Sequence, residues 1–314
     1  MHAVTIVDGQ LEWREHPDPE PGSGELLVCV RAAGLNSADR MQVAGFYPAP
    51  PGSPAHIPGL EFAGEVAAVG AGVQRFGVGD RVMAVVGGGG QAELALVHER
   101  HALPVPDGVA WPEAGGFPEV FTTAHDALFT QCGLAMGDRV CVHGAAGGVG
   151  LAGVQLAVAA GAAVVATVRN VELRDQVASF GATVVAPEDF GTHGPFDVIL
   201  ELIGAPNIAA NFDALAMKGR IVVIGVGGGG DANLNLMAIM QKRAVLRGST
   251  LRTRSLEDKA AAARAVEQHV LPLLADGRVR VPVDATFPMS DAAAAYDRFS
   301  AGGKLGKLVL TNDE

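Results

Sequence analysis

The stretch VCVHGAAGGVG, residues 140–150, joins an apolar run to a loop that is almost free of side chains. Val140–Val142 has the composition of a short buried strand, and Val149–Ala160 can form a helix. The small residues of the turn let backbone N–H groups come close to a ligand, while the helix N-terminus presents the positive end of its dipole. The stretch therefore predicts strand, tight turn and helix, an arrangement that can hold a phosphate.

Residues 145–150 read A-x-G-x-x-G, with Ala145 in the first glycine position of the dinucleotide-binding pattern G-x-G-x-x-G. Alone this match is weak, because a tight turn with close packing would use the same residues. The context strengthens it, since further strand and helix segments follow. The P-loop pattern of nucleotide hydrolases is absent from the sequence. We therefore interpret the turn as the start of a Rossmann fold.

Apolar strand-like segments alternate with helix-length segments from about Gly133 to residue 250. Strands that are apolar along their whole length are typical of a parallel sheet covered by helices on both faces. The expected strands are Arg139–His143, Ala163–Val168, Val184–Ala186, Asp197–Leu202, Arg220–Gly225 and Ala244–Gly248. The expected helices are Val149–Ala160, Glu172–Phe180 and Asn207–Met217. The fold class is therefore α/β, with a doubly wound parallel sheet.

The remainder of the chain is richer in short strands. Residues 1–117 contain strand-like runs broken by glycine and proline clusters. The last part has a helix start near Ser255 and a stop at Gly277, followed by strand-like segments at Val279–Phe287 and Leu305–Leu310. Because the parallel sheet is complete by about residue 250, we expect a discontinuous β-rich domain of residues 1–117 and 251–314 around a Rossmann domain of residues 118–250.

Composition narrows the function. The chain has 314 residues, 49% hydrophobic content and a net charge of −11, and it lacks the clustered cations on which nucleic-acid affinity depends. The N-terminus does not read as a signal peptide, and no apolar run is long enough to span a membrane, so we expect a cytoplasmic protein without a membrane partner. Cys29, Cys132 and Cys141 form no disulfide or metal-binding pattern, and we interpret them as small buried hydrophobes.

The residues that select between NADH and NADPH are expected at the end of the second Rossmann strand, where an acidic side chain would bind the ribose of NAD. The sequence there has no carboxylate and has Arg169 followed by Asn170, with Arg174 further along. A guanidinium suits a 2′-phosphate, and each charge-assisted hydrogen bond of about 1.5–3 kcal/mol would favour it roughly 10- to 100-fold. The sequence therefore predicts NADPH rather than NADH.

Several further motifs join the glycine turn. They are AGLNSAD at 33–39, IPGLEFAG at 57–64, GVGDRV at 77–82, TA at 123–124, GSTLR at 248–252 and GKLVL at 306–310. Together they resemble the medium-chain dehydrogenase/reductase (MDR) superfamily over essentially the whole chain, and most closely its zinc-free quinone oxidoreductase branch. The resemblance implies a GroES-like β domain packed on a Rossmann domain, with the active site in the cleft between them.

The resemblance also implies the cofactor site. It places Asn36 near the nicotinamide, and it assigns the nicotinamide and pyrophosphate to Thr123, Ala146, Gly147, Gly148 and Val149. The crevice should be lined by residues at the carboxyl ends of later strands, which are Leu202, Ile203, Gly204, Ile224, Gly225 and Val226. Arg169, Asn170 and Arg174 complete the predicted cofactor site. Arg252 is a weaker candidate. Relatives often carry a lysine and a tyrosine near the 2′-phosphate, where this chain has Leu173 and Pro187. Relatives also pair the sheet edge across a dimer, so Lys242–Ser249 is expected to join two copies.

The zinc ligands of related alcohol dehydrogenases are missing. Their cysteine corresponds to Asn36 and their histidine to Leu60, and neither side chain can replace a thiolate or an imidazole around Zn²⁺. We therefore expect no metal. Zinc polarises an oxygen of the substrate, whereas quinones and α,β-unsaturated carbonyls accept hydride without that help. The missing ligands thus favour an activated acceptor.

Two residues are the candidates for catalysis. Asn36 is expected near the nicotinamide, where its amide can hydrogen-bond the acceptor or the ribose; alternatively it only completes a turn. Tyr47 matches a tyrosine that lines the pocket in this branch and donates a proton in enoyl-thioester reductases; alternatively it only packs under a proline-rich loop. Asp39 is interpreted as orienting its loop or pairing with Arg40 rather than taking part in the chemistry.

The sequence thus favours an NADPH-dependent, zinc-independent reductase of quinones or other activated alkenes. One alternative is an enoyl-thioester or 2-alkenal reductase on the same scaffold. The other is a non-catalytic NADPH-binding sensor or structural protein.

Overall fold

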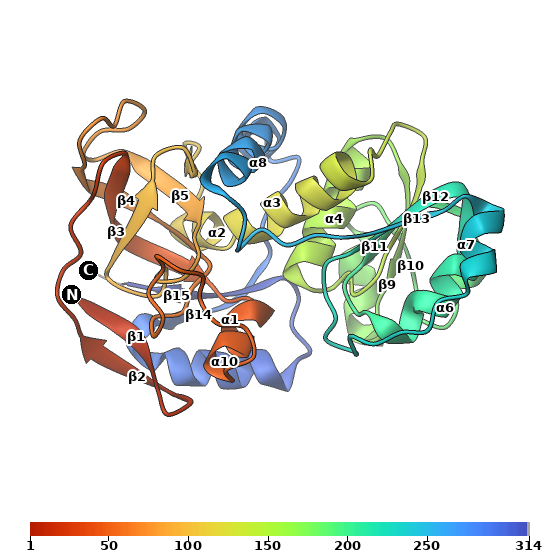
Figure 1. Cartoon of the computed structure of the whole chain (residues 1–314), viewed down its shortest axis with the longest axis horizontal. Coiled ribbons are helices and arrows are strands. Elements are labelled where there is room, and N and C mark those ends of the chain that lie inside the picture. Colours follow the sequence, from red (N-terminus) through yellow and green to blue (C-terminus); the bar gives the residue numbers. More distant parts are fainter. Residues whose placement is uncertain (313–314) are drawn as a thin grey trace. The chain divides into compact units, whose positions relative to one another are not determined.

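The computed structural model describes residues 1–312, which form two compact units (Figure 1). Unit 1 comprises Met1–Glu119 and the segment that starts at Leu251. Unit 2 is Val120–Thr250. Among the described residues, no helix is long and apolar enough to cross a membrane.

Unit 2 is built on a parallel sheet with the strand order β10-β9-β8-β11-β12-β13 (Figure 1). Its strands are β8 (Arg139–Val142), β9 (Ala163–Thr167), β10 (Thr183–Val185), β11 (Phe196–Glu201), β12 (Leu215–Val223) and β13 (Val245–Gly248). Numbered within the unit, this order is 3-2-1-4-5-6, the arrangement of a dinucleotide-binding sheet. The predicted doubly wound α/β fold is confirmed.

Helices connect these strands. They are α3 (Pro118–His125), which begins at the boundary with unit 1 and continues into η1 (Asp126–Gln131), α4 (Gly148–Ala159), η2 (Val171–Leu173), α5 (Arg174–Ala178), η3 (Phe190–His193), α6 (Ala205–Ala214) and α7 (Leu236–Lys242). Helix α4 packs tightly on the turn before it, because a Cβ added at Gly150 would lie 2.5 Å from the Gly144 carbonyl oxygen. Phe190, Phe196 and Phe212 pack in the apolar core of the unit.

Unit 1 is organised around the long strand β3 (Glu25–Gly34), which pairs with β4, β6 and β15. The sheet order is β14-β15-β3-β4-β5-β7. The other strands are β1 (His2–Val7), β2 (Gln10–Glu15), β4 (Glu61–Val69), β5 (Arg81–Val85), β6 (Leu94–His98), β7 (Ala102–Pro104), β14 (Val283–Pro288) and β15 (Lys307–Thr311). The helices are α1 (Ser37–Val43), α2 (Trp111–Gly115), α8 (Leu256–His269), α9 (Leu271–Ala275), η4 (Met289–Asp291) and α10 (Ala292–Ala301).

The C-terminal segment completes the sheet that the N-terminal segment begins. Val309 of β15 lies opposite Gly34 of β3 in an antiparallel pair. Strand β14 runs parallel to β15, with α10 as the crossover between them. Residues 275 positions apart in the sequence thus become neighbours in one sheet.

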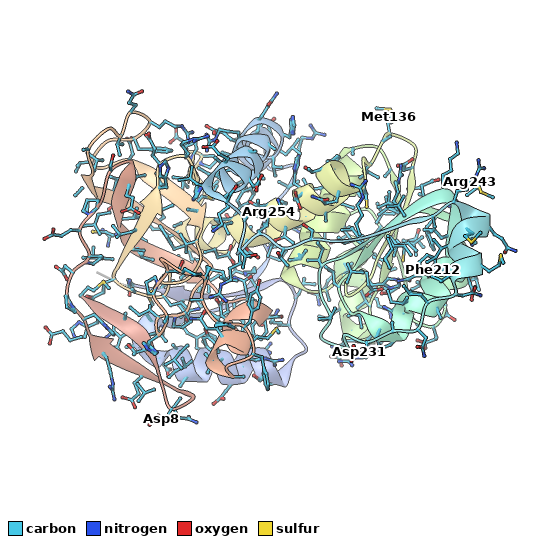
Figure 2. The ribbon with its side chains drawn as sticks, in the orientation of Figure 1. Asp8, Met136, Phe212, Asp231, Arg243 and Arg254 are labelled. Carbon is cyan, nitrogen blue, oxygen red and sulfur yellow. The ribbon has the colours of Figure 1, made fainter. Side chains whose placement is uncertain are left out.

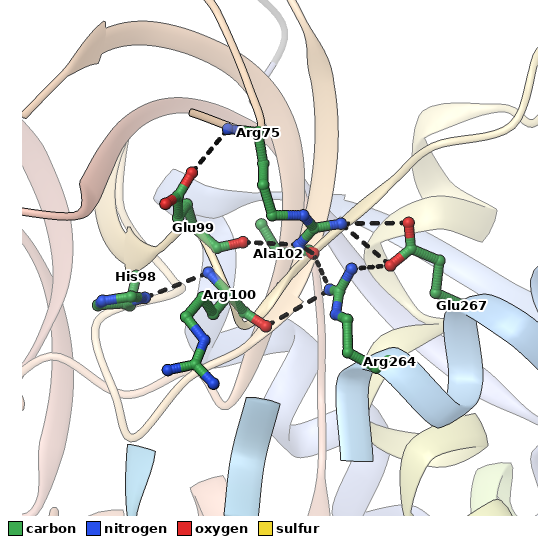
Figure 3. A network of polar contacts seen from close by, with 7 residues as sticks. All are labelled: Arg75, His98, Glu99, Arg100, Ala102, Arg264 and Glu267. Atoms are coloured by element: carbon green, nitrogen blue, oxygen red, sulfur yellow. Dashed lines mark hydrogen bonds and ion pairs between the residues drawn. The ribbon is translucent and has the colours of Figure 1, made fainter. Parts of the chain in front are cut away.

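Helix α8 is tied to the β-rich core of unit 1 by charged side chains (Figure 3). The Ser255 hydroxyl accepts from Asp258 N at 3.2 Å, so the helix start expected at Ser255 is present. Arg264 donates to the Ala102 carbonyl at 2.8 Å, and Arg75 pairs with Glu267 at 3.0 Å. The neighbouring cations and burial lower the pKa of Arg264 to about 10, with burial as the larger cause.

Some expected boundaries were wrong. The helix expected over Asn207–Met217 ends at Ala214, and Leu215 already begins β12. This strand can start early because Lys218 adopts a positive φ of 63° and the β11–β12 register shifts there. The strand expected from Val279 starts at Val283.

Candidate functional site

The glycine-rich turn of unit 2 leaves the backbone N–H groups at the start of α4 available to a ligand. Helix α4 has Gly147 as its N-cap, and no side chain caps its first turn. Ala146, Gly148 and Val149 are only partly buried. A Cβ added at Gly147 would meet only the Gly144 carbonyl oxygen, at 3.5 Å, so one side of the turn is open. This geometry fits a pyrophosphate, which would accept from the free N–H groups of the first turn.

The end of β9 carries the two arginines predicted to select the cofactor. Arg169 is exposed two positions after Thr167, the last residue of the strand. Arg174 folds back so that its Nε donates to the Val168 carbonyl at 3.0 Å, and Asn170 accepts from Glu172 N at 3.0 Å. The turn is therefore ordered by its own hydrogen bonds, and the two guanidinium groups belong to one short segment.

The loops after β11 and β12 lie against each other. A Cβ added at Gly225 would lie 2.5 Å from the Leu202 carbonyl oxygen, and Ile224 N donates to the Glu201 carbonyl at 2.9 Å. Gly204 is buried with a φ of 103°, while Val226 is 48% exposed. Thr123 is buried on α3. The structure brings the carboxyl ends of neighbouring strands together at one edge of the sheet, as the switch-point rule requires.

In unit 1, Asn36 belongs to a buried polar cluster. Its Nδ2 donates to Glu61 Oε1 at 3.0 Å and to the Gly34 carbonyl at 3.3 Å, and its Oδ1 accepts from Lys307 Nζ at 2.8 Å. Both amide protons are thus committed within the unit. The side chains of Asn36 and Asp39 also form a capping box at the start of α1.

Lys307 and Glu61 form a buried ion pair in this cluster. Their side chains are 3% and 0% exposed, and Nζ lies 2.5 Å from Glu61 Oε1. Nζ also donates to the Leu35 carbonyl at 2.8 Å, while Glu61 Oε2 accepts from Glu119 N at 2.8 Å. All three ammonium protons therefore have partners, which compensates the cost of burying both charges.

Asp39 holds the start of α1 against a neighbouring loop. Its carboxylate accepts from Asn36 N at 2.8 Å and from Gly59 N at 3.2 Å. Gly59 has a φ of 108°, and an added Cβ would lie 2.4 Å from Gln91 N, so only glycine fits here. Burial raises the pKa of Asp39 to about 6, although both backbone hydrogen bonds and Lys307 oppose the shift. The structure therefore gives Asp39 a role in orienting the loop.

Tyr47 is half-buried beside Arg252. The Arg252 guanidinium lies 4.9 Å from the centre of the tyrosine ring and donates to the Tyr47 carbonyl at 2.8 Å. It also donates to the Gly87 carbonyl at 2.8 Å and to Gln42 Oε1. Burial raises the pKa of the Tyr47 phenol, and Arg252 opposes that shift. Arg252, which the sequence favoured only weakly, is 4% exposed and fixes the loop that carries Tyr47.

No metal-binding group is found among residues 1–312, since no three His, Cys, Asp or Glu side chains lie close enough together to hold an ion. Several buried polar residues have no role in the site expected from the sequence. They are Glu61, His143, Glu201, Asn211 and Lys307. A signal existed for two of them, because Glu201 ends the apolar run FDVILE and Lys307 opens the apolar run KLVL.

Comparisons with known proteins agree with this architecture. Residues 22–107 match the alcohol dehydrogenase GroES-like domain, and residues 175–310 match a family described as zinc-binding dehydrogenase. The chain is 32% identical over 317 residues to a quinone oxidoreductase of Pseudomonas aeruginosa, a match that covers 96% of this chain and 95% of that protein. It is 30% identical over 305 residues to a quinone oxidoreductase of Rattus norvegicus, covering 93% and 90%.

A solved structure gives the same result. The crystal structure of an alcohol dehydrogenase superfamily protein from Novosphingobium aromaticivorans has a TM-score of 0.89 and 28% identity, and the match covers 100% of both chains. The Rossmann sheet and the GroES-like unit together define a two-domain dehydrogenase. The chain belongs to the medium-chain dehydrogenase/reductase superfamily and is an oxidoreductase, as the sequence motifs predicted.

Proposed function

We propose that this protein is an NADPH-dependent oxidoreductase that reduces quinones or other activated alkenes without a zinc ion. The observation that carries the proposal is the polar cluster around Asn36. An amide and a leucine stand where related dehydrogenases have a thiolate and an imidazole, and the nearby Glu61 carboxylate is already neutralised by Lys307. These groups are poor ligands for zinc but suit an acceptor that needs only orientation. The names of the quinone oxidoreductase relatives support the same acceptor class.

The residues of unit 2 fit the cofactor. Bound NADPH would supply the hydride from C4 of its nicotinamide. The open first turn of α4, with Ala146, Gly147, Gly148 and Val149, would bind the pyrophosphate. Thr123 and the loops after β11 and β12 would line the rest of the crevice. Arg169 and Arg174, with Asn170 between them, would hold the 2′-phosphate.

The residues of unit 1 would act on the acceptor and the ribose. Asn36, held in place by Glu61 and Lys307, would orient the acceptor or the nicotinamide ribose. The Tyr47 hydroxyl can donate to the acceptor oxygen, with its loop fixed by Arg252. Since burial raises the pKa of Tyr47, the phenol stays protonated at neutral pH and can act as a donor.

Turnover with a panel of acceptors tests this function. The protein is mixed with NADPH and 1,4-benzoquinone, an enone or an enoyl-thioester, and the oxidation of NADPH is followed by its absorbance. Turnover with the quinone supports the proposal. Turnover restricted to the thioester would support the alternative that Tyr47 suggests, in which case Tyr47→Phe should lower kcat more than cofactor affinity. Tight NADPH binding without turnover on any acceptor would support the sensor alternative.

The choice of cofactor has its own test. Arg169→Ala should raise the KM for NADPH roughly 10- to 100-fold and leave the KM for NADH nearly unchanged, because one charge-assisted contact to the 2′-phosphate is lost. Arg278→Ala, which removes an exposed arginine from unit 1, is the matched control. An unchanged ratio of NADPH to NADH efficiency in Arg169→Ala would contradict the assignment.

We also propose that two copies pair through β13. This strand lies at the edge of the sheet, and all its residues are exposed. Helix α7 ends at Lys242, and its C-cap residue Arg243 is labelled in Figure 2. The helix adds exposed Leu236, Met237 and Met240. An exposed apolar edge of this kind is a site for strand pairing. A monomeric mass in solution would contradict the dimer, and Leu246→Glu should dissociate it.

A further inference from the structure

Four buried polar side chains lie beneath the predicted dinucleotide crevice of unit 2. His143, Glu201 and Asn211 are 0% exposed, and Thr167 is 3% exposed. His143 follows β8, Thr167 ends β9, Glu201 ends β11 and Asn211 lies on α6. The group therefore joins the ends of three adjacent strands to the helix after β11.

Glu201 fixes the orientation of Asn211. The Glu201 Oε1 atom accepts from Ile203 N at 2.6 Å and from Gly204 N at 2.8 Å. Its Oε2 atom accepts from Asn211 Nδ2 at 2.7 Å, and Asn207 Nδ2 adds a longer contact of 3.3 Å to Oε1. Because a carboxylate only accepts, Asn211 must turn its amino group to Glu201 and its carbonyl oxygen away.

Asn211 in turn fixes the tautomer of His143. Its Oδ1 atom lies 2.8 Å from His143 Nε2, and an amide oxygen can only accept, so Nε2 carries the proton. Burial lowers the pKa of His143, although Glu201 and Asn211 oppose the shift, and the ring is neutral. His143 Nε2 has longer contacts to Cys141 Sγ at 3.7 Å and Glu201 Oε2 at 3.9 Å.

Thr167 connects this series of hydrogen bonds to the glycine-rich turn. A neutral ring protonated at Nε2 accepts at Nδ1, so the Thr167 hydroxyl donates to His143 across 3.1 Å. The same hydroxyl oxygen accepts from Gly144 N at 3.4 Å, and the Thr167 carbonyl accepts from Ala145 N at 3.1 Å. Every hydrogen bond from Gly144 to Glu201 therefore has one defined direction.

We infer that this directed chain is a positioning device that sets the glycine-rich turn relative to the loop Ile203–Gly204, the two backbone segments that bracket the dinucleotide. The inference rests on the proposed function. Thr167, His143, Asn211 and Glu201 act as positioning residues through the backbone and are not placed in contact with the cofactor. Glu201 also accepts from the N–H group of Gly204, the N-cap of α6.

The direction of the chain makes it testable without any cofactor. In Glu201→Gln the new amide keeps its oxygen on Ile203 N and Gly204 N and presents its NH₂ group to Asn211. Asn211 must then rotate and offer Nδ2 to His143, which moves the ring proton to Nδ1. The substitution at Glu201 should thus change the tautomer of His143, although Asn211 lies between the two residues.

Nitrogen NMR of the histidine rings, with His143→Gln to assign the signal, measures the tautomer. We expect an Nε2–H ring in the natural protein and an Nδ1–H ring in Glu201→Gln. Asp213→Asn, which neutralises an exposed carboxylate on α6, is the control and should leave the Nε2–H tautomer. An Nδ1–H ring in the natural protein, or an unchanged tautomer in Glu201→Gln, would overturn the directed chain.

The KM for NADPH tests whether these hydrogen bonds position the backbone that binds the cofactor. Thr167→Val removes the hydroxyl at nearly constant volume and should raise the KM for NADPH about 3- to 10-fold, with little change in kcat or in the KM of the acceptor. Thr167→Ser keeps a hydroxyl and should restore the KM. Equal KM values in the natural protein and Thr167→Val would overturn the positioning role. Failure of the natural protein to bind NADPH would instead refute the proposed function and leave the tautomer result intact.

Discussion

Two fully buried glutamates, one in each unit, are stabilised in different ways. Glu61 in unit 1 faces the ammonium of Lys307 at 2.5 Å. Glu201 in unit 2 accepts from backbone and amide N–H groups, and the His143 ring that lies 3.9 Å from its Oε2 is neutral. The first arrangement depends on a matching charge, whereas the second depends on fixed dipoles. The two sites should therefore respond differently to the loss of a charge.

The largest effect is expected in unit 1. Lys307→Met leaves the Glu61 carboxylate buried without its cation, which should lower the free energy of unfolding by about 3–5 kcal/mol. Both tryptophans, Trp13 and Trp111, lie in unit 1, so their fluorescence during denaturation with urea reports this unit. The double variant Lys307→Met/Glu61→Gln should recover much of the loss. If the double variant is no more stable than Lys307→Met, the ion pair is not the source of the effect.

Asp39 lies close to the same charged cluster, and its substitution should have the second-largest effect on the free energy of unfolding. Its pKa is raised to about 6, mainly by burial, so its protonated form is favoured in the folded state. Protonation of Asp39 therefore contributes to the free energy of unfolding. This contribution is fully present below the unfolded pKa of 3.8 and is lost as pH rises through about 6. Over this window the natural protein should lose about 2–3 kcal/mol relative to Asp39→Asn.

The measurement is the urea unfolding of both proteins at several pH values. The hydrogen bonds that Asn cannot make lower the stability of the variant by an amount that is similar at every pH. The informative quantity is therefore how the difference in unfolding free energy between the two proteins changes with pH. A difference that stays constant between pH 4 and pH 7 would contradict the raised pKa.

A smaller effect is expected for Glu201→Gln in unit 2. No buried cation loses its partner, and the two backbone N–H groups keep an acceptor, so the expected loss is about 1 kcal/mol. Hydrogen exchange of the β11 amides measures the local stability of this unit. A loss as large as that of Lys307→Met would show that Glu201 compensates a positive charge, and would remove the contrast between the two carboxylates.

The thiols should show the smallest effect. Burial raises the pKa of Cys132 to about 11 and also raises that of Cys141, so neither forms a reactive thiolate at pH 8. Cys29 is only partly buried. Alkylation of the native protein with iodoacetamide, read by mass spectrometry, should modify Cys29 first. Rapid modification of Cys141 would indicate that the β8 region opens.

The sequence predicted the features that local patterns encode. The turn at residues 140–150, the alternating strands and helices, and the helix start at Ser255 all appear in the structure. These features depend on periodicity and on glycine, which act over a few residues. Errors fell where a backbone irregularity decided the outcome, as at Lys218, where a positive φ lets β12 begin early.

The sequence could not predict the polar contacts that join distant segments. Lys307 and Glu61 are 246 positions apart, and Arg252 and Gln42 are 210 positions apart. A buried Glu201 can be suspected from the apolar run around it, but its partner Asn211 depends on how α6 packs. Asn36 was selected for a role toward the cofactor, and the structure adds that both its amide protons already have partners.

The most direct test of the account is the kcat/KM for NADPH and 1,4-benzoquinone, measured on enzyme treated with a chelator and again after zinc is added. We predict turnover by the chelated enzyme and the same kcat/KM with zinc, because the polar cluster of Asn36, Glu61 and Lys307 needs no metal. Activity that is lost on chelation and restored by zinc, or an enzyme that never consumes NADPH, would contradict it.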